Sequence, residues 1–103
     1  MPDLVAFDID GNVATTVLSD PDRRNAMSTA LLDGLESAVS ATEARDAVQV
    51  LRVRSTGPAF CAGFDLAAMA EDGLLPEFLR RLGGLCRRLR ALPAIVVMEV
   101  QGP

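Results

Sequence analysis

The chain has no histidine, tryptophan or tyrosine and only two cysteines in 103 residues. The lack of histidine excludes the common zinc sites and Cys/His nucleophile pairs, so we expect no metal centre. No apolar run reaches the roughly 18 residues of a membrane span. The N-terminal Met-Pro-Asp-Leu lacks the basic and apolar segments of a secretory signal. We therefore expect a cytoplasmic protein whose two cysteines are free thiols and small buried apolar residues.

Charge excludes another class of partner. Ten basic and fourteen acidic residues give a net charge of −4, which is unfavourable for binding a nucleic-acid backbone. No RNP motif, zinc-ligand spacing or series of stacking aromatics is present either. We expect neither a nucleic-acid nor a membrane partner. The length allows one domain at most, and the 50% apolar fraction supplies a core of Leu, Val and Ala.

The order of elements in the first half is that of an α/β domain. Two alternating runs around Asp10-Gly11 predict a β-hairpin of strands at roughly 3–9 and 12–18, with positive φ at both central turn residues. Ser28 is a suitable N-cap for a helix to about Ala44, in which Gly34 indicates a close packing contact. A strand at 48–53 follows. Hairpin, helix and strand together predict a helical crossover.

The second half repeats the helix-then-strand order. A short helix is predicted at about 65–71, and a longer one at 76–91, begun by Pro76. An apolar stripe marks the longer helix: Phe78, Leu82, Leu85, Leu89 and Leu92. Its arginines lie largely opposite this stripe and predict a solvated face: Arg80, Arg81, Arg87, Arg88 and Arg90. The last strand, 94–100, is apolar enough to be buried on both faces.

The segment Gly57–Leu66 joins a strand to a helix and is the first candidate site. Gly63 permits positive φ and close approach of the backbone to a ligand. Asp65 can cap the following helix and leave backbone N–H groups directed at a phosphate or a polarised carbonyl oxygen. On these residues alone, an ordinary strand-to-helix turn with a buried Phe is the simpler interpretation. No G-x-G-x-x-G follows a strand, which excludes a Rossmann site.

Four segments occur in order: the hairpin that ends near Pro21, and residues 24–28, 60–66 and 92–97. Together they resemble the N-terminal part of the enoyl-CoA hydratase/isomerase (crotonase) superfamily. The hairpin ends near Pro21, and residues 24–28, Arg-Asn-Ala-Met-Ser, are similar to the family's Arg-Asn-Ala-Leu-Ser. Residues 60–66, Phe-Cys-Ala-Gly-Phe-Asp-Leu, are similar to its Phe-Cys-Ala-Gly-x-Asp-Leu, and 92–97 resemble the strand before its second glycine motif. The resemblance implies an α/β fold, an incomplete crotonase-like (ClpP/crotonase) ββα spiral. Residues 1–103 would be the N-terminal part of an acyl-CoA-binding domain.

The resemblance also implies a chemistry. The substrate would be an acyl-CoA thioester, with coenzyme A as part of the substrate and no covalently bound cofactor. Two backbone N–H groups would hold the thioester oxygen as it becomes an enolate, and by motif position the first belongs to Phe64. Losing one such donor costs roughly 2.7–4 kcal/mol in comparable oxyanion holes. The positions matching the coenzyme A-contacting segments are Arg24, Ala26, Met27, Ala62, Gly63, Phe64, Asp65 and Leu66.

Departures from the family pattern leave alternatives open. Phe64 stands where a small residue is usual and would reshape the acyl pocket, and Glu99 would place a costly carboxylate in a strand. We expect a truncated family member whose second oxyanion donor and acid/base residues lie beyond Pro103, with the last strand at an unfinished edge. Hydratase, isomerase, dehalogenase, hydrolase and decarboxylase all remain possible. The alternative is an inactive remnant, or a fragment that folds on association; full-length family members imply a homotrimer or homohexamer.

Overall fold

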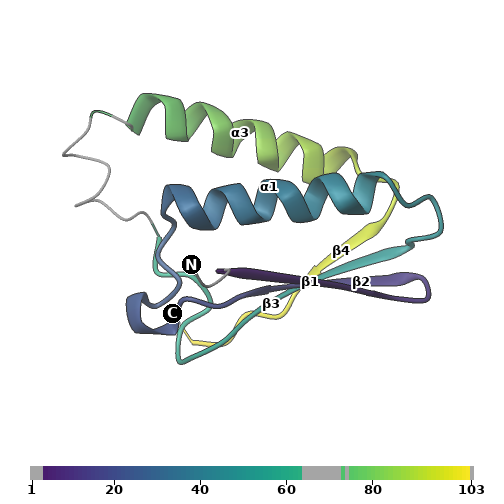
Figure 1. Cartoon of the computed structure of the whole chain (residues 1–103), viewed down its shortest axis with the longest axis horizontal. Helices are drawn as coiled ribbons and strands as arrows, with labels where there is room; N and C mark the ends of the chain where they lie inside the picture. The colour runs from purple at the N-terminus through teal and green to yellow at the C-terminus, as the bar shows by residue number, and fades with distance from the viewer. Residues whose placement is uncertain (1–3, 64–72, 74, 103) are drawn as a thin grey trace.

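The computed structural model describes residues 4–63, 73 and 75–102, which form one layer of strands under one layer of helices (Figure 1). The predicted short helix at 65–71 lies outside these residues. None of the described helices is long and apolar enough to cross a membrane. The elements in chain order are β1 (Val5–Asp10), β2 (Val13–Leu18), the 3-10 turn η1 (Pro21–Arg23), α1 (Thr29–Glu43), β3 (Val50–Ser55), α3 (Leu75–Ala91) and β4 (Ile95–Met98).

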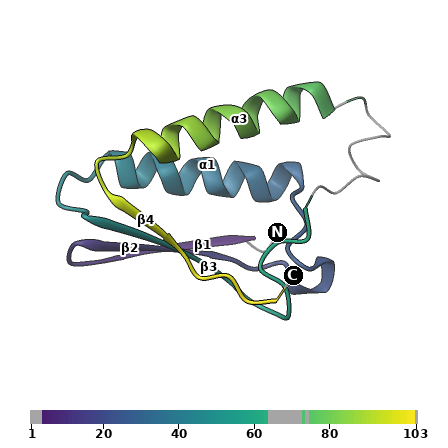
Figure 2. The same cartoon turned by 180° about the vertical axis from the view of Figure 1, so that it is seen from behind.

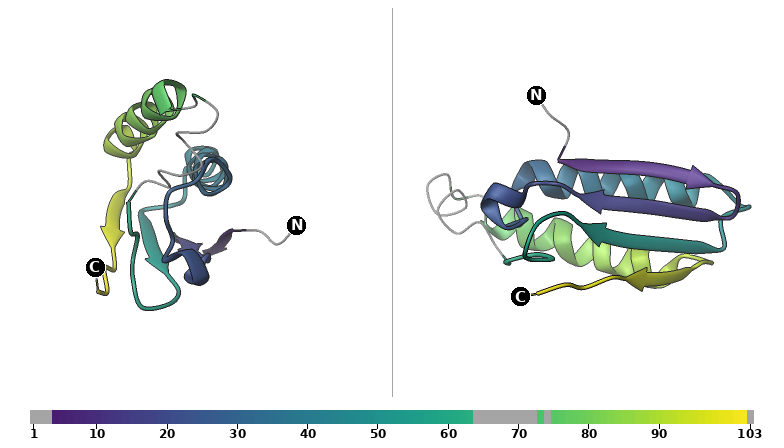
Figure 3. Two further views of the ribbon diagram at one scale, coloured as in Figure 1. Left: turned by 90° about the vertical axis from the view of Figure 1, so that its left-hand side faces the viewer. Right: turned by 90° about the horizontal axis from the view of Figure 1, so that it is seen from below.

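The four strands form one mixed sheet in the order β1-β2-β3-β4. β1 and β2 are antiparallel, whereas β2, β3 and β4 run parallel. Parallel neighbours need a crossover connection, and α1 and α3 supply the two crossovers on the same face of the sheet (Figure 2). The predicted α/β class and helical crossover are therefore confirmed. Viewed end-on, the opposite face of the sheet carries no described helix (Figure 3).

The hairpin forms where predicted, but its turn is shifted by one residue. Asp10 pairs with Val13, so the two central turn residues are Gly11 and Asn12 rather than Asp10 and Gly11. Gly11 has φ +62°, while Asn12 is not among the residues with positive φ. A glycine with positive φ at the first central position is the arrangement of a type II′ turn. The expectation of two positive φ values was therefore wrong, since this turn type needs only one.

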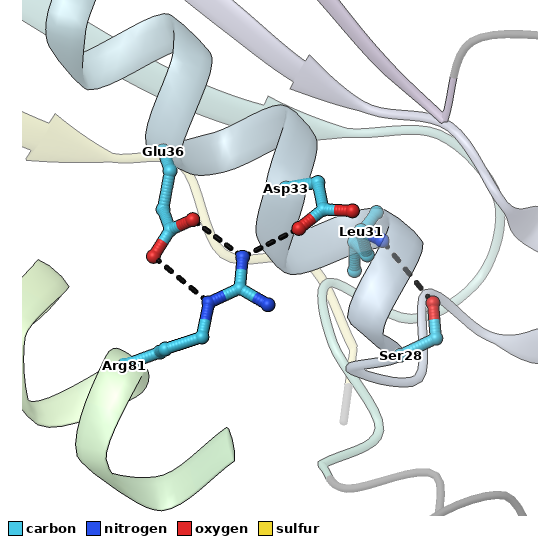
Figure 4. Close-up of polar contacts among 5 residues, drawn as sticks. All are labelled: Ser28, Leu31, Asp33, Glu36 and Arg81. Carbon is cyan, nitrogen blue, oxygen red and sulfur yellow. Dashed lines mark hydrogen bonds and ion pairs between the residues drawn. The ribbon is translucent and has the colours of Figure 1, made fainter. Parts of the chain in front are cut away.

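Helix α1 begins and ends at the predicted signals. Ser28 is the N-cap, and its Oγ accepts a hydrogen bond from the Leu31 N–H at 3.2 Å (Figure 4). Ala44 is the C-cap. The close contact expected at Gly34 is present, because a Cβ added there would lie 2.6 Å from Cγ2 of Val5. Helix α1 therefore packs directly on the edge strand β1.

The buried residues in the described part of the chain include two apolar clusters. One lies between the helices and contains Leu32, Val39, Phe78 and Leu85. The other lies against the sheet and contains Ala14, Val48, Leu51 and Val53. Strand β3 runs from Val50 to Ser55, two residues later than predicted, and Val48 is buried just before it. Both crossovers thus bury their helix stripe, as the spacing of apolar residues predicted.

The expectation that the last strand is buried on both faces was wrong. Strand β4 is shorter than predicted, and the exposed fractions of Ile95 and Val97 are 68% and 42%. Position gives two reasons. Ile95 and Val97 pair with Val50 and Arg52, on the sheet face that carries no described helix (Figure 3). Strand β4 is also the edge strand of the described sheet, as expected, and has a neighbour on one side only. The cost expected for Glu99 is also absent. Its Oε2 lies 3.4 Å from Nε of Arg52 and 3.3 Å from Nε of Arg54, at a half-exposed site.

Two arginines of α3 are not simply solvated, which corrects the expected character of that face. Arg81 is bound by Asp33 and Glu36 of α1, with closest oxygens at 2.5 Å (Figure 4). Hydrogen bonds to Glu36 and Asp33 raise the pKa of Arg81 above its usual range. Arg88 bonds Glu43 of α1 at 2.6 Å. The prediction failed because it treated α3 alone, whereas the carboxylates come from the neighbouring helix.

The two cysteines are free, but the prediction that both are buried was wrong. Cys61 is half-buried and Cys86 is exposed. Neither lies at the centre of a layer: Cys61 is in the loop after β3, and Cys86 lies on α3 next to the buried Leu85. A cysteine is buried by its neighbours and not by its own modest apolar character.

Candidate functional site

Three loops meet where the parallel strands end. Since β2, β3 and β4 run parallel, the segments 19–28, 56–63 and 99–102 all leave the same edge of the sheet (Figure 3). Ligands of open α/β sheets bind outside the carboxyl ends of the strands. The predicted site residues that the structure describes all lie in the first two of these segments.

Backbone hydrogen bonds join the two segments predicted to contact coenzyme A. The Ala62 N–H donates to the Arg24 carbonyl at 3.0 Å, and the Met27 N–H donates to the Gly63 carbonyl at 2.6 Å. Ala26 lies between these two bonds. The structure thus brings five of the predicted positions together, from segments almost forty residues apart. Three others lie outside the described residues: Phe64, Asp65 and Leu66.

The first of these segments turns sharply. Arg24 and Asn25 have consecutive φ values of +54° and +55°, the left-handed region that few residues other than glycine adopt. The Arg24 N–H closes the preceding turn by donating to the Pro21 carbonyl at 3.0 Å. Arg24 is exposed, whereas Asn25 is fully buried. The turn therefore presents a cation to solvent and points an amide inward.

Glycine is required in the second segment for a conformational reason. Gly63 has φ +100°, as the sequence predicted, and nothing among the described residues lies within 4 Å of a Cβ added there. Ala62 and Gly63 are both exposed. The backbone at this point is therefore open to a ligand, which is the property required of a binding wall.

Sequence reasoning assigned no role to Asn25. Its Oδ1 accepts from the Asp20 N–H at 2.7 Å. Its Nδ2 donates to the carbonyls of Thr56 at 2.9 Å and Ala59 at 3.0 Å. The only available signal was that asparagine tolerates positive φ better than most residues. No spacing rule indicates which distant carbonyls such a side chain meets.

Gln101 holds the second loop from the other side and was also missed. Its carbonyl accepts from the Phe60 N–H at 3.0 Å. Its Nε2 donates to Ser55 Oγ at 2.9 Å and to the Gly57 carbonyl at 3.2 Å. A Cβ on Gly102 would lie 2.2 Å from the Pro58 oxygen, so the two backbones are in contact. The loop after β3 is thus fixed on both flanks.

An apolar cavity lies between the sheet and the helices. Its volume is about 160 Å³, and its lining includes Met27, Phe60 and Cys61 together with residues of α1, α3 and the strands. An engineered apolar cavity of about 150 Å³ stays dry and binds benzene. The cavity is therefore suited to a small hydrocarbon group, and it shares residues with both loops of the site.

The chain is similar to proteins of known class over nearly its full length. A family model described as enoyl-CoA hydratase/isomerase matches residues 8–103. The probable enoyl-CoA hydratase EchA14 of Mycobacterium tuberculosis is 36% identical over 85 residues, which are 80% of this chain and 33% of that protein.

Solved structures agree. A probable enoyl-CoA hydratase from Mycobacterium thermoresistibile superposes with a TM-score of 0.83 at 30% identity, over 96% of this chain and 41% of that one. An enoyl-CoA hydratase/isomerase from Xanthobacter autotrophicus Py2 gives 0.86 at 30% identity, over 97% and 39%. The fold is therefore crotonase-like and partial. The chain spans about a third to two-fifths of the length of these relatives.

Proposed function

This chain belongs to the enoyl-CoA hydratase/isomerase family, and we propose that it forms the coenzyme A-binding wall and the first oxyanion donor of an acyl-CoA enzyme. The observation that carries the proposal is the pair of hydrogen bonds joining Arg24 to Ala62 and Met27 to Gly63. They place the exposed Arg24 beside the exposed, positive-φ backbone of Gly63. Both lie at the end of the sheet where the parallel strands have their carboxyl ends. An arginine can bind a phosphate through charge-assisted hydrogen bonds, and a glycine backbone lets a ligand approach closely.

The proposed mechanism uses backbone groups. Ala62 and Gly63 line the coenzyme A moiety, and Arg24 approaches a phosphate. The N–H of Phe64 donates to the thioester oxygen. As a proton leaves the α-carbon, negative charge develops on that oxygen, and a preorganised donor stabilises it more than it stabilises the ground state. A bulky side chain at Phe64 is compatible with this role because the donor is backbone.

The apolar cavity supports an acyl substrate. Met27, Phe60 and Cys61 belong to the loops of the site and also line the cavity, so a hydrocarbon group entering it stays close to the coenzyme A wall. Motif position assigns only one of the two oxyanion donors to this chain and none of the acid/base residues. We therefore expect coenzyme A binding without turnover from these 103 residues, with the reaction type left open among hydration, isomerisation and their relatives.

The proposal also covers the oligomeric state and the cellular compartment. A homotrimer or homohexamer is expected of the full-length protein from the family resemblance. The two free thiols support a reducing, cytoplasmic compartment.

Isothermal calorimetry with coenzyme A and crotonyl-CoA tests the proposal, with crotonyl-CoA hydration assayed alongside. Arg24→Gln removes the proposed phosphate contact and should weaken coenzyme A binding about tenfold, the loss of one charge-assisted hydrogen bond. Arg45→Gln is the matched control, since Arg45 is also exposed but follows α1 at the opposite end of the sheet. A folded, monodisperse protein without coenzyme A affinity would contradict the proposal that the chain binds coenzyme A.

A second candidate is a non-catalytic chain that acts, or folds, only in association with another polypeptide. The exposed edge favours it: Ile95, Met98 and Val100 are 68%, 50% and 65% exposed, and an unpaired apolar edge strand promotes association. Sedimentation velocity across a concentration series distinguishes the candidates. A monomer that unfolds cooperatively and binds coenzyme A would exclude the second one.

A further inference from the structure

We infer that Asn25 is a positioning residue for the proposed coenzyme A site, because its buried side chain locks the Arg24–Met27 turn onto the loop after β3. The inference rests on the proposed function for its ligand, but its geometry does not. Asn25 has no exposed surface, and both ends of its amide are occupied by backbone partners.

The two donated hydrogen bonds reach across the fold. Thr56 and Ala59 lie 31 and 34 positions after Asn25. Their carbonyls bracket the Gly57-Pro58 corner, at which the chain leaves β3, and Ala59 is itself buried. Fixing these two carbonyls therefore fixes the direction in which the chain proceeds toward Ala62 and Gly63.

The backbone on either side of Asn25 makes the second connection. Arg24 accepts from Ala62, and Met27 donates to Gly63. Asn25 thus lies between the two backbone bonds that align the wall, while its side chain holds the base of the same loop. If the amide is lost, the part-buried Thr56 carbonyl loses this donor, and the buried Ala59 carbonyl keeps only the 3.4 Å bond from Ser55 Oγ. An under-satisfied buried acceptor costs more than an absent bond in solvent.

Asparagine meets three requirements here at once. It tolerates the φ of +55°, it supplies two donors on one nitrogen, and it supplies an acceptor for the Asp20 N–H. Aspartate keeps the size and the acceptor but replaces both donors with an oxygen facing two carbonyl oxygens. Glycine keeps the φ and removes the side chain without adding charge.

The test compares Asn25→Asp with Asn12→Asp, the same chemical change at the exposed hairpin turn, where the Asn12 amide bonds the Gln49 side chain. Amide-resolved hydrogen exchange is measured at Met27 and Ala62 and, as the reference, at Gln49 and Ile95, whose N–H groups bond at the far end of the sheet. Coenzyme A affinity is measured by calorimetry on the same folded samples. Asn25→Gly is measured in parallel, in case the aspartate variant does not fold.

Asn25→Asp should accelerate exchange at Met27 and Ala62 at least about tenfold relative to Gln49 and Ile95 and weaken coenzyme A binding by a similar factor, whereas Asn12→Asp should do neither. Equal acceleration at all four amides, or unchanged coenzyme A affinity in a folded Asn25 variant, would overturn the positioning role. If the unaltered protein does not bind coenzyme A, the proposed function fails. The exchange pattern then still decides whether Asn25 joins the two loops.

Discussion

The two helical crossovers share one connection type and differ in what they bury. In β2–α1–β3, the strand residues facing the helices are inaccessible, with Ala14 at 0% and Leu51 at 1% exposure. In β3–α3–β4, the helix buries Phe78 and Leu85, but β4 leaves Met98, the register partner of the buried Val53, 50% exposed. Strands β3 and β4 are both rich in Val, Ile or Leu, so hydrophobicity does not explain the contrast in exposure. β2 and β3 each have a strand on both sides, and β4 has one neighbour in the described sheet.

The difference shows that the burial of a strand side chain depends on the helices and strands that cover it. A strand side chain is covered from above by a helix and from the sides by adjacent strands, and an edge position removes one of those covers. The second crossover is attached to the first through the β3–β4 pairing and through α3, by its apolar stripe and by ion pairs from Arg81 and Arg88 to α1.

The largest effect is expected from truncating the shared helix interface. Leu32 has no exposed surface and packs in the cluster with Phe78 and Leu85, so Leu32→Ala should lower the free energy of unfolding by about 2–5 kcal/mol. Leu79→Ala, at a side chain that is 46% exposed, should change it by less than about 0.5 kcal/mol. Urea unfolding followed by circular dichroism measures both. Equal losses would remove the contrast between a covered and an uncovered position.

Effects of intermediate size on stability are expected at two helical glycines, with opposite signs at the two positions. Gly34→Ala places a Cβ 2.6 Å from Val5 Cγ2, and the overpacking should exceed the gain in helix propensity, for a net loss of about 1 kcal/mol. Gly83→Ala meets only the Arg87 guanidinium at 3.6 Å. It should stabilise the protein by about 0.5–1 kcal/mol. Thermal unfolding of both variants measures the difference, and stabilisation by Gly34→Ala would show that β1 yields at that contact.

The smallest effect is expected from the exposed ion pair that joins the two crossovers. Hydrogen bonds from Arg88 lower the pKa of Glu43 from its ordinary value of 4.5. Because the folded pKa is the lower one, the stabilisation is complete above the ordinary value and is lost as the pH falls through the folded pKa. Glu43→Gln should therefore reduce the dependence of stability on pH in the acidic range. Glu77→Gln, which breaks a pair within α3, should leave the contribution of the Glu43–Arg88 pair to stability unchanged.

Local signals made most of the fold predictable. Helix α1 was bounded correctly because its cap, Ser28, acts within three residues, and the apolar spacing of α3 gave its buried stripe. The position of the hairpin was also predictable. Its turn type was not, since Asp10-Gly11 and Gly11-Asn12 are both acceptable turn pairs and the register decides between them.

Five residues predicted for the candidate site lie together in the structure, but the contacts that hold them there were not predictable. Arg24, Met27, Ala62 and Gly63 were identified from motif resemblance, and the structure brings them into hydrogen-bonded contact. The binding roles of these residues remain predictions, and so does the oxyanion role of Phe64, which lies outside the described residues. Asn25 was missed because its partners are carbonyls, which every residue carries and no motif marks.

By itself, the sequence determined the ends of α1 and the need for positive φ at Gly63, because each depends on residue types within a short window. It also determined the α/β class and the family, through the order of such local signals along the chain. Only the tertiary structure decided that Asn25 bonds Thr56 and Ala59, that Arg81 meets carboxylates of α1, and that β4 is exposed. Those outcomes depend on which distant backbone or side-chain group comes within about 3 Å of a polar atom and on how many neighbours cover a strand. Packing alone sets both.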